Sequence, residues 1–383
     1  MSQRITLLML SRMGQGDGGR ETWLSNFLDE IARQSRDVTF DIIHQRADTP
    51  TLLDVPSRRD IVASIRQIDR RWLWCPVSVE LLIRLAFSGG WIEPGARIAG
   101  IGGLAEAIAV MLLTPFRGRK RRMMWLRTIY TREKSAQLPG PTRRMALALE
   151  TFVLHRFGLV LANGEDTAAF YRGLDIPVEV VPNAIPLAKW SMSPPPETAP
   201  LRVGFIGRLT EVKGIFAFLE AVEYCQQDWP GAFRFHIAGD GPARAAVDML
   251  ATRAPMTVHG QLDNLATRNV VADVDVCVAL TLSSADLGGG GISNALLEQM
   301  AAQRIIVAWD NDIFLQVLDG RSAYLVPQGD ARTLADTLFH IANHRNEALE
   351  KATNARSLAQ DFSIEAHVDR FFSIIGNHED WCR

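Results

Sequence analysis

The chain has 383 residues, of which 47% are hydrophobic and 22% charged, and its formal net charge is -2 at pH 7. This length favours two domains over one, and the composition excludes disordered and fibrous proteins. The balance of charge argues against a general nucleic-acid-binding protein. The four cysteines form no CxxC pair, so we expect free thiols in a cytoplasmic protein.

In the first half, short apolar runs alternate with helical patterns, which predicts a parallel sheet with crossover helices. The strands are expected at residues 5–10, 38–44, 97–101, 124–129, 159–162 and 178–181. After the first strand, helical spacing predicts one face packed on the sheet, formed by Trp23, Leu24, Phe27, Leu28 and Ile31. The apolar stretch 98–116 contains Glu106 and several glycines. We interpret it as a strand, a turn and a buried helix, and not as a membrane span of roughly 20 residues.

Residues 193–200 hold four prolines, which excludes a helix interior and predicts a linker. Beyond it, strands are expected at residues 202–206, 234–238, 256–259, 274–279, 305–307 and 323–326. We therefore predict an α/β protein with two doubly wound, Rossmann-like domains. The N-terminal domain covers residues 1–192 and the C-terminal domain residues 201–362.

Two cations follow the first strand of the second domain: Arg208 and Lys213 lie between Gly207 and Gly214. Ligands of such sheets bind beyond the carboxyl ends of the strands. Glycines let the backbone approach a ligand, and the cations can neutralise a diphosphate. A pair of solvated surface cations explains the same residues equally well.

A glycine-rich segment, residues 286–298, precedes another predicted helix. Four glycines followed by Ser293 and Asn294 predict exposed N–H groups at a helix N-terminus, which is an anion site. Glu298 lies one turn further on, where it could accept hydrogen bonds from ribose hydroxyls. The alternative is a flexible loop with Glu298 at the favourable end of the helix dipole.

The ordered series VPNAIP (181–186), VGFIGRLTEVKG (203–214), AGDGP (238–242), VHGQLDN (258–264) and SNALLEQMA (293–301) resembles the C-terminal half of the retaining glycosyltransferases of family 4, which have the GT-B fold. The resemblance implies transfer of a hexose from a nucleotide-diphosphate sugar, in a cleft between the domains, without a metal or cofactor. The acceptor would be a glycan, a lipid-linked glycan or a small molecule, as in polysaccharide biosynthesis. The last helix, within residues 363–383, would return to the N-terminal domain.

The resemblance also implies roles for particular residues. Arg208 and Lys213 would hold the diphosphate, Glu298 would bind the ribose, and the backbone at 259–262 would border the base. The other expected donor-binding residues are Gly18, Gly19, Gly207, Leu262, Gly291, Ser293 and Asn294.

One departure from the family pattern is Gly290, which stands where the family carries a second glutamate eight positions before Glu298. Asp286 is the nearest acid that could replace it. The departure leaves open an alternative, a protein that binds a nucleotide sugar but has little or no transferase activity.

In the first domain, Arg127 and Glu133 are candidate acceptor-side residues. The basic run from Arg117 to Arg122 beside apolar residues is compatible with peripheral contact to the inner face of a membrane. A solvated loop or a phosphorylated acceptor would also explain it. Residues 14–19 spell GxGxxG, but no acid ends the second predicted strand, so a dinucleotide oxidoreductase is disfavoured.

Overall fold

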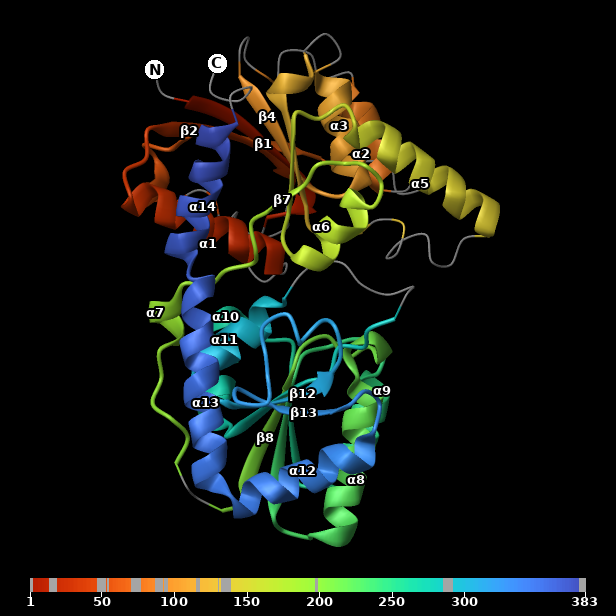
Figure 1. The fold of residues 1–383 in the computed structure, drawn as a ribbon, viewed down its shortest axis with the longest axis vertical. Helices are drawn as coiled ribbons and strands as arrows, with labels where there is room; N and C mark the ends of the chain where they lie inside the picture. Colours follow the sequence, from red (N-terminus) through yellow and green to blue (C-terminus); the bar gives the residue numbers. More distant parts are fainter. Residues whose placement is uncertain are drawn as a thin grey trace. The chain divides into compact units, whose positions relative to one another are not determined.

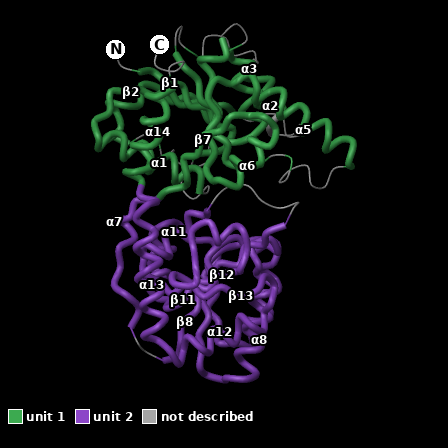
Figure 2. Tube along the Cα trace, viewed as in Figure 1, with its two compact units in different colours: residues 1–184, 288–291, 364–383 green, residues 185–287, 292–363 purple. Residues whose placement is uncertain are grey.

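The computed structural model describes residues 3–13, 19–46, 53, 55–69, 77–86, 92, 96–114, 118–129, 131, 139–196, 199–284 and 292–378. The chain divides into two compact units (Figure 2). Of the described residues, unit 1 holds those up to Ala184 and from Ile364 onward, and unit 2 holds those from Ile185 to Ser363. Each unit has a parallel sheet between helices (Figure 1), so the predicted α/β class is confirmed.

Unit 1 has a seven-stranded sheet in the order β3-β2-β1-β4-β5-β6-β7. The strands are β1 (Gln3–Arg12), β2 (Val38–Gln45), β3 (Val62–Ile68), β4 (Arg97–Gly102), β5 (Arg122–Leu126), β6 (Leu159–Ala162) and β7 (Glu179–Val180). The sequence did not predict β3, which lies at the sheet edge. The strand predicted at residues 124–129 also begins two residues later than β5. The prediction left out Arg122 because it is charged, but Arg122 is buried at the start of β5, where its guanidinium donates to Thr114.

The helices of unit 1 cover both faces of this sheet. They are α1 (Gly19–Arg33), α2 (Val77–Ala86), α3 (Leu104–Leu113), α5 (Gly140–Leu154), α6 (Glu165–Arg172) and α14 (Ile364–Asn377), with short 3-10 turns η1 (Pro56–Arg58) and η2 (Arg119–Arg121). The predicted apolar face of α1 is confirmed, since all five of its residues are buried. Helix α14 packs beside α1, and the rings of Phe27 and Phe371 meet edge to face at 5.2 Å.

Unit 2 has a six-stranded sheet in the order β10-β9-β8-β11-β12-β13. The strands are β8 (Leu201–Ile206), β9 (Phe233–Ala238), β10 (Met256–Gly260), β11 (Val276–Ala279), β12 (Ile305–Asp310) and β13 (Tyr324–Pro327), close to the predicted positions. The helices are α7 (Leu187–Trp190), α8 (Ile215–Asp228), α9 (Arg244–Ala251), α10 (Asn264–Asp273), α11 (Asn294–Ala301), α12 (Ala331–Asn343) and α13 (Arg345–Ala359), with 3-10 turns η3 (Glu211–Lys213) and η4 (Gln360–Phe362). One continuous apolar core joins these elements.

The chain enters unit 2 at Ile185 and leaves it after Ser363, and these two points are neighbours in the structure. The backbone N–H of Ile185 donates to Phe362 O at 3.0 Å, and Ile185 also forms an isolated parallel bridge with Ser363. The division thus falls before the proline-rich segment 193–200, which we predicted as the linker. Trp190 already packs in the core of unit 2, so the described part of the proline-rich segment belongs to that unit.

The apolar stretch 98–116 forms β4, a turn at Gly103 and helix α3 as far as it is described. Among the described residues, no helix has the length and apolar character needed to cross a membrane. Cys225 and Cys277 are buried free thiols, and Cys75 and Cys382 lie outside the described residues.

Candidate functional site

The loops at the carboxyl edge of the unit 2 sheet are joined by backbone hydrogen bonds. Directly after β8, Gly207 N donates to Ala238 O at 2.9 Å. Leu209 N donates to Asp240 O at 2.9 Å, and Gly239 N donates to Gly260 O at 2.7 Å. The turns that follow three neighbouring strands are therefore held together.

Glycine is required where two of these turns touch. Gly239 has a φ of +141°, and a Cβ atom there would lie 1.9 Å from Gly207 O. Gly241 has a φ of +156°, and a Cβ atom there would lie 2.6 Å from Leu209 O. Since only glycine accepts both this backbone conformation and this proximity, the turn at residues 239–242 fixes the position of the loop after β8.

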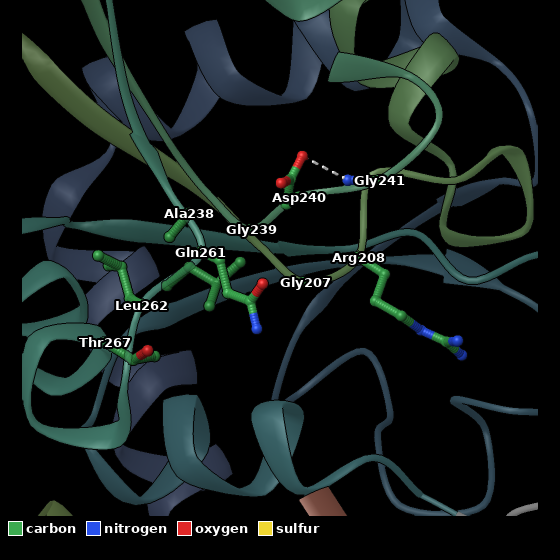
Figure 3. A pocket seen from close by; sticks show the side chains of 10 residues that line it. Gly207, Arg208, Ala238, Gly239, Asp240, Gly241, Gln261, Leu262 and Thr267 are labelled. Atoms are coloured by element: carbon green, nitrogen blue, oxygen red, sulfur yellow. Dashed lines mark hydrogen bonds between the residues drawn. The ribbon is translucent and has the colours of Figure 1, made fainter. Parts of the chain in front are cut away.

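A cavity of about 470 Å³ opens at this edge. Figure 3 shows Arg208 on one side of it and Leu262 with Thr267 on the other. It is lined by Ile206, Gly207, Arg208, Ala238, Gly239, Asp240, Gly241, Gln261, Leu262 and Thr267. The structure thus brings together three predicted donor-binding residues, Gly207, Arg208 and Leu262. Sequence reasoning missed Thr267, because no local pattern shows which face of α10 borders a cavity.

Lys213 lies close to Arg208. Its ammonium donates to Thr281 Oγ1 at 3.3 Å, at the carboxyl end of β11. Burial lowers the pKa of Lys213, and the positive charge of Arg208 lowers this pKa further. Neither cation forms an ion pair with an acidic group in the described part of the chain. Two neighbouring positive charges without a counterion are arranged to attract an anion.

The backbone explains why Lys213 points toward β11. Gly214 caps η3 with a φ of +75°, and a Cβ atom there would lie 2.3 Å from Leu280 O. Leu282 N donates to Val212 O at 2.8 Å. The loop carrying Lys213 is therefore fastened to the segment that follows β11.

Helix α11 carries three further predicted residues. Ser293 is the N-cap, and its Oγ accepts from Leu296 N at 3.2 Å. The side-chain oxygen of Asn294 is buried and has no hydrogen-bond partner among the described residues. Burial raises the pKa of the half-buried Glu298 carboxyl to about 8, so this group is mostly protonated at neutral pH. Asp286, Gly290 and Gly291 lie outside the described residues.

In unit 1, Gly19 is the first residue of α1, and the space around its Cα is open. Arg127 directly follows β5 and is buried. The candidates Gly18 and Glu133 lie outside the described residues. These residues belong to a different unit from Arg208, Lys213 and Glu298.

The predicted basic run needs a correction. Arg119, Lys120 and Arg121 are exposed in η2, but Arg122 is buried. Its Nε donates to Thr114 Oγ1 at 3.0 Å, and a second nitrogen donates to Thr114 O. Arg122 is wrongly included among residues that could meet a membrane, because its hydrogen bonds hold it inside unit 1. Arg117 lies outside the described residues.

The similarity to a known protein family lies within unit 2. Residues 200–344 match the family described as glycosyl transferases group 1. The chain is 29% identical to a putative colanic acid biosynthesis glycosyltransferase, WcaL, of Salmonella typhimurium, over 44% of this chain and 43% of that protein. It is 31% identical to a phosphatidyl-myo-inositol mannosyltransferase of Mycobacterium leprae, over 49% of this chain and 50% of that protein. The matches thus span half or less of these two relatives.

Solved structures resemble the whole chain. Sucrose-phosphate synthase from Thermosynechococcus elongatus has a TM-score of 0.74 at 17% identity, over 97% of this chain and 98% of that one. Anabaena HepE in complex with UDP and glucose has a TM-score of 0.73 at 15% identity, over 97% and 99%. At these identities the likeness shows the fold, which is GT-B as the sequence predicted.

Proposed function

We propose that this chain is a retaining glycosyltransferase that uses a nucleotide-diphosphate sugar, because its residues 200–344 match the family described as glycosyl transferases group 1. The observation that carries the proposal is the pair Arg208 and Lys213, two neighbouring cations at the carboxyl edge of the unit 2 sheet that form no ion pair within the described ranges. The cavity beside Arg208 has the size of a small-ligand site. HepE was solved with UDP and glucose, which is consistent with such a ligand.

The chemistry follows from charge. As the bond between the sugar and the diphosphate breaks, negative charge grows on the leaving group, and Arg208 with Lys213 stabilises it. Because the protein supplies this positive charge itself, the mechanism needs no metal ion. Glu298 would hold the ribose, and its protonated carboxyl can both donate and accept a hydrogen bond. The acceptor oxygen then bonds to the sugar on the face that the leaving group has left, and its hydroxyl proton passes to the departing diphosphate.

The test is hydrolysis of UDP-, GDP- and ADP-sugars by the whole protein. We expect Lys213→Ala to lower kcat about 100-fold or more, the usual effect of losing one group that stabilises transition-state charge. Lys351→Ala is a matched control, because Lys351 is a half-buried lysine of unit 2, as Lys213 is, but it donates to Gly320 O far along the chain from the candidate site. Equal rates for wild type and Lys213→Ala would remove Lys213 from the mechanism.

The alternative of a binding protein without transferase activity is not favoured, because the relatives reported above are named as transferases. Their printed names refer to polysaccharide synthesis and to a lipid, phosphatidyl-myo-inositol. We infer that the acceptor of this protein is likewise a glycan or a lipid-linked molecule.

Peripheral contact with a membrane is part of the proposal. On α5, Met145, Leu149 and Phe152 follow one another at helical spacing and are 45–72% exposed. Arg119 Nε donates to Phe157 O at 2.6 Å, which fastens the basic turn η2 to the segment that follows that helix. Apolar side chains beside cations suit the surface of a membrane rich in anionic lipid. This surface would hold the enzyme at the cytoplasmic face, near lipid-linked acceptors.

A further inference from the structure

Arg127 is a buried cation at the carboxyl edge of the unit 1 sheet. It directly follows β5, and its backbone N–H donates to Gly102 O at 2.9 Å, at the end of the neighbouring strand β4. Only 9% of the residue is exposed. Burial is the main reason that its pKa falls to about 9.

The guanidinium of Arg127 is held on two sides. Its carbon lies 4.3 Å from the centre of the Trp23 ring, and its Nη2 donates to Asn183 Oδ1 at 2.7 Å. Nε and Nη1 are both buried and have no hydrogen-bond partner among the described residues. The side chain is therefore fixed in place with several N–H groups left without an acceptor.

No carboxylate of the described residues forms an ion pair with Arg127. The charge of Glu21 favours the guanidinium, but only weakly beside the effect of burial, and the charge of Arg20 opposes it. His367 stays neutral, because burial lowers its pKa to about 3, so it neither adds to the positive charge of Arg127 nor offsets it. Among the described residues, the positive charge of Arg127 is thus buried with only the weak influence of Glu21 and the Trp23 ring to offset it.

Such an arrangement is costly for stability. A buried donor without a partner lowers the stability of the folded state, and a buried charge without an ion-pair partner lowers it further. Arg122, at the other end of the same strand, shows the usual solution, since Thr114 accepts from two of its nitrogens. Strongly perturbed, unpaired groups of this kind are characteristic of binding sites.

We infer that Arg127 binds an anionic group of the substrate, a carboxylate or a phosphate, through Nε and Nη1. The inference rests on the proposed function and adds a substrate property to it: the sugar or the acceptor carries a negative charge in addition to the diphosphate of the donor. Asn163, directly after β6, and Asn183, three residues after β7, are buried polar residues, and Asn183 N donates to Asn163 O at 3.3 Å. Charge-assisted bonds to a planar guanidinium select such groups over neutral ones.

The first test measures stability and needs no substrate. If Arg127 is kept for binding, Arg127→Met leaves the melting temperature unchanged or raises it, because it removes an uncompensated buried charge. Arg122→Met is the matched control and is expected to lower the melting temperature by several degrees, because its hydrogen bonds to Thr114 are lost. A fall for Arg127→Met as large as that for Arg122→Met would identify Arg127 as a structural residue and overturn the inference.

The second test locates the anion with paired substrates. We would compare UDP-glucuronate with UDP-glucose as donors, and mannose 6-phosphate with mannose as acceptors, for the whole protein and for Arg127→Gln. If Arg127→Gln lowers kcat/KM about tenfold more for UDP-glucuronate than for UDP-glucose, the anion is on the donor sugar. If it lowers kcat/KM about tenfold more for mannose 6-phosphate than for mannose, the anion is on the acceptor. Equal effects within both pairs would overturn the inference. If the wild type acts on no nucleotide sugar, the proposed function fails, but the melting temperatures still show whether Arg127 is a structural residue.

Discussion

Glu298 and Lys213 would both be charged in water at neutral pH, yet burial shifts the pKa of each toward its neutral form. For Glu298 the folded protein holds its proton up to a pH of about 8, whereas the unfolded chain releases it near 4.5. Between these values the folded state binds more protons than the unfolded state. The free energy of unfolding therefore falls as the pH rises through this window.

Glu298→Gln should remove this dependence. We expect the wild type to lose about 3–4 kcal/mol of stability between pH 5 and pH 8, and the variant to lose clearly less, since one pKa unit corresponds to roughly 1.4 kcal/mol and this window covers most of the difference between the two pKa values. Urea unfolding at several pH values measures the difference. Glu350→Gln, on α13, serves as the control. Parallel pH profiles for Glu298→Gln and wild type would contradict the raised pKa.

For single residues, the sequence predicts a ligand-binding role best where the side chain comes soon after a predicted strand. Arg208 and Lys213 could be predicted because a glycine turn after an apolar run marks the ligand edge of a parallel sheet. The unpartnered nitrogens of Arg127 could not, because its burial depends on Trp23 and on the distant Asn183. Whether a charged group finds a partner is decided by tertiary packing, which no local pattern records.

At the scale of elements, the contact between the turns after β8 and β9 leads to a prediction about Gly239. Gly239→Ala places a methyl group 1.9 Å from Gly207 O, so one of the turns must move. We expect a loss of about 3 kcal/mol or more, together with weaker binding of UDP, because the displaced turn carries Arg208.

The control is Gly231→Ala. Gly231 has a φ of +84° but no atom near a substituted Cβ, so only the strained backbone costs free energy, roughly 1–2 kcal/mol. Urea unfolding and UDP titration of both variants separate the two effects. The same loss in both would mean that backbone conformation alone requires Gly239.

Elements that are buried on both faces were the easiest to predict, since their apolar runs are continuous. Strand β3 was missed because it lies at the sheet edge and most of its residues are only half-buried, so that it shows neither a continuous run nor a clean alternation. The sequence predicted the boundary between the units at residues 193–200, whereas the structure places it at Ile185, and here too local composition was not sufficient. Prolines exclude helix and strand, but the packing of Trp190 decides which unit the segment joins.

For the whole molecule, the exposed apolar residues of α5 predict attachment to membranes. We expect the wild type to sediment with vesicles that contain phosphatidylglycerol. Replacing Met145, Leu149 and Phe152 by serine should weaken binding about tenfold or more, because the lost apolar area no longer enters the lipid. Binding should also weaken as salt screens the cations of η2.

Met249→Ser with Leu265→Ser is the matched control, because these apolar residues are equally exposed but belong to unit 2. Their replacement should leave sedimentation unchanged. A wild type that stays in the supernatant with anionic vesicles would contradict the membrane proposal and leave the donor chemistry untouched.

Helix α14 has a consequence for how the protein is made. Phe371 and Ile375 belong to the core of unit 1, yet the ribosome adds them only after all of unit 2. Unit 2 can thus finish folding during translation, while the packing of Phe27 against Phe371 waits until the last helix emerges. The core of unit 1 is therefore completed last, although its first strand is made first.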